Sequence, residues 1–199
     1  MADTATQNDP SIAERSLLLR HVDGDGTAFA DLLRRWRAPV YGYLVRSGLD
    51  RPTCDDLFQE IFLRVHAASR SYDSSRPLAP WIFAIVVNTV RSHFRKARVR
   101  RIMESRDEVP EVPDPGASGL ETAEAHETAA FFDSLLQKLS PSRREVVLLV
   151  CVEHLEQKDV ARILGIPVGT VKTHLSRART ELARAWARTE LSMPLEETQ

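Results

Sequence analysis

The sequence predicts an all-α protein with two small helical domains joined by a flexible acidic linker, and the C-terminal domain carries a helix-turn-helix. Apolar residues recur at three- and four-residue spacing in both halves of the chain, and no stretch alternates as a strand would. A segment rich in proline, glycine and acidic residues separates the halves. We therefore expect domains at residues 11–102 and 123–190, with the linker at residues 103–122.

The N-terminal half is expected to begin with a polar, disordered terminus, followed by a helix that stops at Gly24. A longer helical pattern covers residues 27–48, where Pro39 should kink or divide the helix. The next helix starts near Thr53, whose hydroxyl can cap the first turn beside two aspartates.

A serine- and proline-rich stretch predicts a loop at residues 71–80, and a long helix is expected at residues 81–101. We expect Trp81, Phe83 and Phe94 of this helix to lie in the core. Its end, from Arg91 on, holds six arginines and lysines and no acidic residue. Such a cluster can hold a DNA backbone, although a solvated helix end also favours cations through its dipole.

The C-terminal half is expected to hold four further helices. The first covers residues 121–139. Ser140 then serves as the N-cap of the second and Pro141 as its first residue, while Ser142 and Glu145 could form a capping box. The last two helices come from the stretch "DVARILGIPVGTVKTHLSRAR", residues 159–179.

This stretch has the pattern of two packed helices around a tight turn. Gly165 suits a left-handed turn after the first helix, and Pro167 suits the start of the second. Free N–H groups near Gly169 and Thr170 can bind a phosphate, and cations beside short hydrogen-bonding side chains suit a major groove. An ordinary amphipathic helix would also have a polar outer face. The inward positions are Val171, Leu175, Ala178 and Leu182, and the outward positions are Lys172, Thr173, Ser176, Arg177 and Thr180.

Composition limits the other functions. The formal net charge is −1, but a basic segment is followed by an acidic one, so a nucleic-acid partner is not excluded. Cys54 and Cys151 are expected to be buried free thiols. The scattered histidines form no HExxH motif, so we predict no catalytic residue, no metal and no cofactor. The longest apolar run has seven residues, which favours a soluble, cytoplasmic protein without membrane insertion.

Two motifs in order are specific to one family. The N-terminal "DDLFQEIFLRVH" and "PWIFAIVVNTVRSHFRK" resemble the promoter-binding half of sigma factors, and "LSPSRREVVLLVCVEHLEQKDVARILGIPVGTVKTHLSRAR" resembles their C-terminal half. Their order and spacing are similar to those of the extracytoplasmic-function sigma factors over about residues 12–188. The resemblance implies a subunit that binds core RNA polymerase, recognises the −10 and −35 promoter elements and promotes initiation without covalent chemistry.

The resemblance also implies site residues. The second helix of the helix-turn-helix would bind the −35 element, and His174 stands where relatives commonly have an arginine. In the first domain a flipped −10 base would enter a pocket in the loop before the Trp81 helix. The implied −35 residues are Gly169, Thr170, Lys172, Thr173, His174, Ser176 and Arg177, and the implied −10 residues are Tyr72, Asp73, Ser74, Ser75, Arg76, Asn88, Arg91, Arg95 and Lys96.

The implied partners are promoter DNA, an anti-sigma factor and core RNA polymerase, through the clamp coiled coil of its largest subunit and the flap of the second. The "DDLFQE" helix would dock on the clamp with one of its two apolar sets, which contain Ile61 and Phe62 respectively. Alternatively, both sets are buried between helices. The implied docking residues are Asp56, Gln59, Glu60 and Phe62.

Two other classes of protein fit the helical pattern less well. A response regulator has a similar helix-turn-helix, but it needs an α/β receiver domain with strands. A helical adaptor that binds only proteins has no need of the basic cluster after Arg91 or of an outward cationic face on the last helix.

Overall fold

A computed structural model describes residues 10–103 and 131–190. Within these ranges the chain forms helices and loops and no strand, so the all-α prediction is confirmed. The helices fall into two compact units, one N-terminal and one C-terminal. The N-terminal stretch, most of the linker and residues 121–130 lie outside the described residues, and the domain boundaries therefore stay a prediction.

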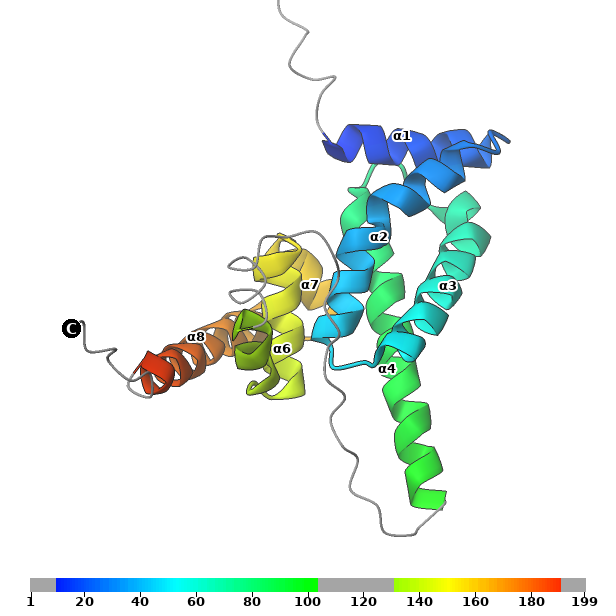
Figure 1. Ribbon diagram of the computed structural model, residues 1–199. Coiled ribbons are helices and arrows are strands. Elements are labelled where there is room, and N and C mark those ends of the chain that lie inside the picture. The colour runs from blue at the N-terminus through cyan, green and yellow to red at the C-terminus, as the bar shows by residue number, and fades with distance from the viewer. Residues whose placement is uncertain (1–9, 104–130, 191–199) are drawn as a thin grey trace, which may run out of the picture. The chain divides into compact units, whose positions relative to one another are not determined.

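Unit 1 is a bundle of three helices with a fourth helix across one end. The bundle consists of α2 (Ala28–Arg46), α3 (Arg51–Ala68) and α4 (Leu78–Met103), with the short 3₁₀ turn η2 (Ser69–Ser71) after α3. The helix α1 (Pro10–Val22) crosses the end of the bundle, and the C-terminal half of α4 extends beyond α2 and α3 (Figure 1).

Aspartates cap two helices of unit 1. Asp25 precedes α2 and accepts hydrogen bonds from the backbone N–H (2.9 Å) and hydroxyl (2.7 Å) of Thr27, which hold its pKa well below the ordinary value. The N-cap of α3 is Asp50, which accepts from the Thr53 N–H at 2.9 Å, so the prediction that Thr53 is the cap is wrong. Pro39 lies inside α2 and does not divide it.

Aromatic rings fill the core of unit 1. Phe83 of α4 contacts Trp36 and Tyr43 of α2 with ring centroids 5.9 and 5.8 Å apart, and all three are buried. The predicted core position of Phe83 is thus confirmed. Phe94 is 44% exposed, so its predicted core position is wrong. Trp81 is half-buried against Tyr72 at 5.1 Å.

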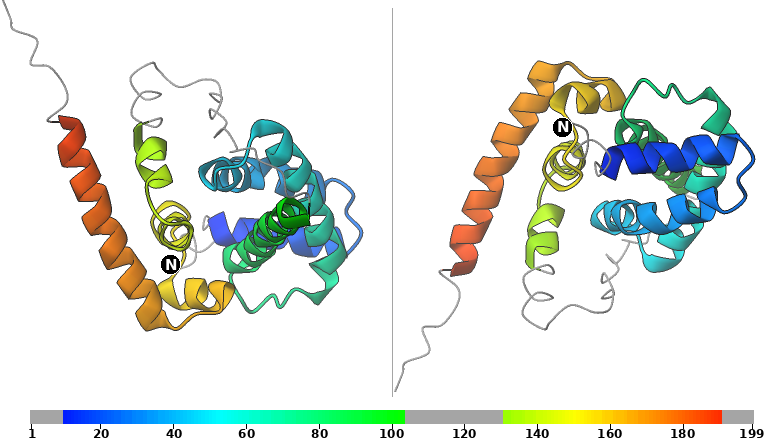
Figure 2. Two further views of the ribbon diagram at one scale, coloured as in Figure 1. Left: turned by 90° about the horizontal axis from the view of Figure 1, so that it is seen from below. Right: turned by 90° about the horizontal axis from the view of Figure 1, so that it is seen from above.

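Unit 2 contains a helical segment at residues 131–137, α6 (Pro141–Val147), the π-helical turn η3 (Leu148–Val152), α7 (Gln157–Leu164) and α8 (Val168–Glu190). The long α8 runs beside α6 and the 131–137 segment (Figure 2), where Phe131 and Trp186 meet edge to face at 5.1 Å. Since the helix begins at Pro141, Ser142 and Glu145 lie inside it, and the predicted capping box is wrong. Cys54 is buried as expected, whereas Cys151, in the π turn, is exposed.

Arg144 joins two helices of unit 2. Its guanidinium donates to the carbonyl oxygens of Leu136 at 3.0 Å, Gln137 at 2.9 Å and Leu139 at 3.4 Å, at the end of the 131–137 segment. The last carbonyls of a helix have no partner within the helix, and a cation there also complements the dipole. Burial lowers the pKa of this guanidinium, which still remains charged at neutral pH.

A pair of histidines links α1 to α3. His21 Nε2 lies 2.9 Å from His66 Nδ1, and the ring of Phe29 contacts both imidazoles, tilted against His21 at 4.5 Å and edge to face with His66 at 5.4 Å between centroids. The two ring centroids are 5.0 Å apart, which is close to the nitrogen separation plus the two ring radii. The nitrogens therefore point at each other as donor and acceptor, and they do not converge on a common metal position.

Acidification should destabilise unit 1 through this pair. Burial, and secondly the charge of His66, lower the pKa of His21 from its ordinary value of 6.5. A histidine whose pKa is lower in the folded state binds more protons in the unfolded state. Its contribution to stability is therefore present above the unfolded-state pKa of 6.5, and it is lost as the pH falls from there through the lower pKa of the folded state.

The measurement is urea unfolding followed by the fluorescence of Trp36 and Trp81, in a Trp186→Phe background that leaves only unit 1 reporting. The urea concentration at the midpoint of unfolding should decrease when the pH is lowered from about 7.5 to 5.5, the range in which histidines titrate. This decrease should be larger for the Trp186→Phe parent than for a variant that also carries His21→Gln and His66→Gln. Equal falls would contradict the role of the pair.

Candidate nucleic-acid interface and partner surface

The turn between α7 and α8 depends on Gly165. Its φ is +67°, in the left-handed region, and the N–H of Ile166 donates to the Ala161 carbonyl at 3.0 Å. This is the bond of a Schellman motif, which closes a helix and redirects the chain within two residues. The buried apolar positions of α7 are Val160, Ala161 and Leu164, as the sequence predicts, and Asp159 is buried as well.

The first turn of α8 differs in one respect from the prediction. The N–H of Thr170 donates to the Pro167 carbonyl at 2.9 Å, so this group is not free to bind a phosphate. Gly169 lies beside it, and a Cβ at that position would meet nothing within 4 Å. Packing inside the protein therefore gives no reason for glycine here, whereas a glycine lets an external group come close to the backbone.

The outer face of α8 is polar and cationic. Val171 and Ala178 are fully buried and fix the rotation of the helix. Thr173 and Thr180 donate their hydroxyl hydrogens back to the carbonyls four residues earlier, at 2.9 and 3.2 Å, so each keeps a hydroxyl oxygen as an outward acceptor. The exposed residues of this face are Lys172, Thr173, Ser176, Arg177 and Thr180.

His174 lies at the edge of this face and is half-buried. Its Nδ1 is enclosed and has no hydrogen-bond partner among the described residues. Burying an N–H group without an acceptor costs more free energy than burying a lone pair without a donor. The enclosed Nδ1 therefore carries the lone pair, and the proton of the neutral ring is on Nε2. His174 thus offers one neutral donor where a guanidinium would offer a charged fork.

The loop before α4 is folded on itself. Asp73 accepts hydrogen bonds from the backbone N–H (3.0 Å) and hydroxyl (2.6 Å) of Ser75, which hold the pKa of its carboxyl below the ordinary range. Tyr72 is only 9% exposed and donates its hydroxyl to the Arg76 carbonyl at 2.5 Å. Its predicted place among the base-contacting side chains is therefore wrong, because the ring is part of the core. Ser74, Ser75 and Arg76 are exposed.

One side of α4 carries exposed polar and cationic side chains. Asn88, Arg91 and Arg95 are exposed and follow one another at three- and four-residue spacing, so they share a helix face. Ile102, which is 65% exposed, continues the same stripe. Lys96 is also exposed, but it lies to one side of the stripe.

The exposed side of α3 has a different character. Asp56 and Gln59 are exposed, and Glu60 pairs with Arg64 four residues later. Phe62 is 3% exposed and packs on Phe58 at a centroid distance of 4.7 Å, so its predicted contact with a partner is wrong. The apolar residue on this surface is Leu63, which is 69% exposed and which the sequence analysis missed. Its signal was the spacing of Asp56, Gln59, Glu60 and Leu63, which places them on one helix face.

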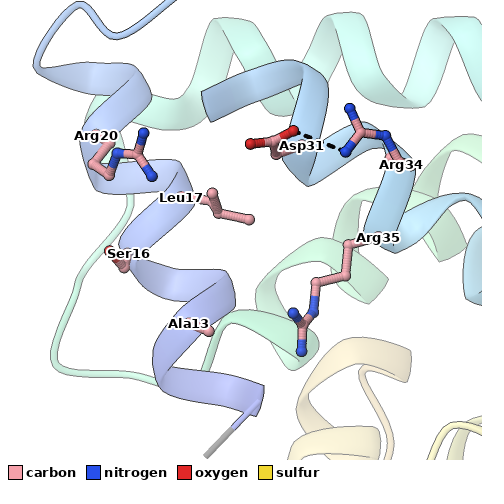
Figure 3. Close-up of a pocket in the computed structure, with 7 residues that line it drawn as sticks. All are labelled: Ala13, Ser16, Leu17, Arg20, Asp31, Arg34 and Arg35. Carbon is pink, nitrogen blue, oxygen red and sulfur yellow. Dashed lines mark ion pairs between the residues drawn. The ribbon is translucent and has the colours of Figure 1, made fainter. Parts of the chain in front are cut away.

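A shallow recess between α1 and α2 collects three arginines (Figure 3). Arg34 pairs with Asp31 at 3.0 Å, Arg35 with Glu14 at 2.7 Å, and Arg20 with a carboxylate at 2.5 Å. Because each guanidinium is already neutralised, the recess is not an anion site.

Neither metal ligation nor membrane insertion is indicated by the described part of the chain. In residues 10–103 and 131–190 no group of three or more histidine, cysteine or acidic side chains could hold a metal ion. None of the helices there combines the length and the apolar character that a bilayer span requires.

Comparison with known proteins covers both units. Residues 18–100 match the family model for sigma-70 region 2, and residues 132–182 match that for sigma-70 region 4. The chain is 31% identical over 172 residues to the ECF RNA polymerase sigma factor SigM of Mycobacterium tuberculosis, covering 86% of this chain and 84% of SigM. It is 27% identical over 181 residues to the RNA polymerase sigma factor CnrH of Cupriavidus metallidurans, covering 88% and 95%.

Solved structures give the same result. The structure of CnrH in complex with the cytosolic domain of CnrY aligns with a TM-score of 0.65 at 25% identity, covering 88% of this chain and 98% of CnrH. The sigma factor RpoE in complex with the anti-sigma factor NepR from Bartonella quintana aligns with a TM-score of 0.64 at 24% identity, covering 77% and 95%. The second likeness concerns the fold alone.

Proposed function

The chain belongs to the extracytoplasmic-function sigma factors of RNA polymerase, as its paired motifs predict, and we propose on this basis that its two units bind separate promoter elements while unit 1 docks on the polymerase. As a member of this family it is a promoter-recognising initiation factor and not an enzyme, and its partner is core RNA polymerase. The site of action that follows from this partner is the cytoplasm.

Unit 2 reads the −35 element with α8 in the major groove. The observation that carries this proposal is the outer face of α8 behind the glycine turn, which exposes Lys172, Thr173, Ser176, Arg177 and Thr180. Arg177 and Lys172 bind base edges or phosphates, and Thr173 offers an acceptor and a methyl group to them. Gly169 lets a phosphate approach the first turn. A separate surface of unit 2 meets the flap of the polymerase.

Unit 1 reads the −10 element and helps to open it. Ser74, Ser75 and Arg76 surround a flipped base, while Asn88 reaches a base edge from α4. Arg91, Arg95 and the neighbouring Lys96 hold the backbone of the displaced strand. The tightly bonded loop supports this proposal, because a base that leaves its stack needs a receptor that is already formed.

Unit 1 docks on the clamp coiled coil through the exposed face of α3. An apolar side chain ringed by polar ones is typical of the centre of a protein interface. Here Leu63 takes that place, with Asp56, Gln59 and Glu60 around it. Two structural relatives are bound to CnrY and to the anti-sigma factor NepR, respectively. An anti-sigma factor that covered this face of α3 would keep the present chain from the polymerase.

Run-off transcription with purified core polymerase on a library of genomic fragments tests the function. Transcripts should appear only when the protein is added, and the mapped starts should share two upstream elements. Arg177→Ala should weaken binding to the −35 element about tenfold, the cost of losing one specific contact. Lys138→Ala removes an exposed charge of unit 2 away from α8 and is the matched control. Absence of protein-dependent transcripts would refute the proposal.

Leu63→Asp should separate polymerase binding from folding. Burying a leucine contributes about 1.5–3 kcal/mol, so a carboxylate there should weaken the binding of core polymerase more than tenfold. The side chain is mostly exposed, and the helical content should stay unchanged. Ile102→Asp, on the DNA-facing stripe of α4, serves as the control and should retain core binding. Fluorescence anisotropy of labelled protein measures both, and equal affinities of the Leu63 variant and the parent would exclude this docking face.

His174 should make −35 binding less sensitive to salt than an arginine would. Each neutralised phosphate contributes about 0.9 to the slope of log affinity against log salt. We therefore expect His174→Arg to steepen this slope by about one contact. His174→Gln keeps a neutral donor near the Nε2 position and should leave the slope unchanged. If both variants have the slope of the parent, His174 does not face a phosphate.

A further inference from the structure

We propose that Arg15 of α1 is a positioning residue for promoter opening, because it holds the loop at residues 72–76 in the shape that receives the −10 base. This inference rests on the proposed function of that loop. Nη1 of Arg15 donates to the carbonyl of Ser74 at 3.3 Å, across 59 residues of sequence. The bond ties the tip of the loop to a helix that crosses the end of the bundle (Figure 1).

The loop has its own internal bonds, and they leave Ser74 as the point that needs support. One carboxylate oxygen of Asp73 accepts from Ser75, and the other lies 3.2 Å from Nε of Arg76. Both oxygens of Asp73 are therefore used within the loop, which makes this residue an organiser of the turn. These bonds close the turn on either side of Ser74, whose carbonyl is instead fixed from outside by Arg15.

The helix that carries Arg15 is itself anchored. Leu18, one turn later, is fully buried, and α1 packs against both η2 and α4. The floor of the loop is also fixed, because Tyr72 stacks on Trp81 and burial raises the pKa of its hydroxyl. That hydroxyl stays protonated at neutral pH and keeps donating to Arg76. Arg15 thus ties this anchored helix to the non-helical segment between η2 and α4.

The consequence for opening follows from preorganisation. A flipped base loses its stacking, and this cost must be offset by contacts in the receptor. A loop that had to order itself at the same moment would add the entropy of its own residues to that cost. Arg15 removes part of this entropy before the DNA arrives, so it acts on strand capture and not on recruitment.

The test uses holoenzyme and a single-stranded oligonucleotide that carries the −10 element mapped by run-off transcription. Arg15→Met keeps the length of the side chain but not the donor, and it should weaken strand binding about fivefold, as expected for the loss of one hydrogen bond. Assembly with core polymerase should be unchanged. Amide hydrogen exchange at Ser75 should become faster. Arg15→Lys, which retains a donor, should restore part of the affinity.

Arg34→Met is the matched control, since Arg34 is an exposed arginine of unit 1 that pairs with Asp31 of its own helix. It should bind the strand like the parent. Parent-like strand binding and exchange in Arg15→Met would overturn the inference. The inference would also be overturned if Arg15→Met lowered the slope of log affinity against log salt by the equivalent of one phosphate contact while amide exchange at Ser75 stayed unchanged. That result would make Arg15 a direct phosphate ligand. If the parent itself does not prefer the −10 strand to a scrambled one, the proposed function of the loop fails instead.

Discussion

The burial of apolar side chains on α3 and α8 determines which residues of these two helices face outward. Val171 and Ala178 are seven residues apart and fully buried, so two turns of α8 cannot rotate without exposing one of them. This constraint places the polar residues of the opposite side outward, and two of them, Thr173 and Thr180, are further fixed by hydrogen bonds to backbone carbonyls. The same holds for α3, where Ile61 and Val65 are fully buried and leave Leu63 on the outside.

The spacing of apolar residues predicted which side chains are buried where a helix has a single buried side. It failed where burial depends on which other helices pack against that one. The outward set on α8 was predictable because the helix buries a single stripe. Phe62 was misassigned because α3 also meets Phe29 of α2, at a centroid distance of 6.5 Å, which widens its buried face. Phe94 was misassigned for the opposite reason, since the C-terminal half of α4 extends beyond α2 and α3 (Figure 1) and Phe94 remains 44% exposed there.

Local geometry explains the remaining errors. A π turn has more residues per turn than an α-helix, so η3 shifts the positions that follow and brings Cys151 to the surface. Asp50 caps α3 because the helix already begins at Arg51, so the N–H of Thr53 lies in the first turn and is itself a group that needs an acceptor. Tyr72 turns inward because a carbonyl of its own loop satisfies its hydroxyl. The spacing of residue types does not indicate the exposure of Cys151, the capping residue of α3 or the burial of Tyr72.

In unit 1 the charges of the loop before α4 are paired within the loop, and the cationic stripe lies on α4. A carboxylate that faced DNA phosphates alone would repel them, yet Asp73 lies in the loop nearest to the predicted strand. Its hydrogen bonds to Ser75 keep it ionised, and Arg76 neutralises it at 3.2 Å. An anion that is bonded and neutralised within its own turn costs little electrostatically and makes the turn stiffer. The other cations of the proposed strand-binding surface lie on the α4 stripe, so in the proposed function the loop supplies shape for one base while the helix supplies attraction for the strand.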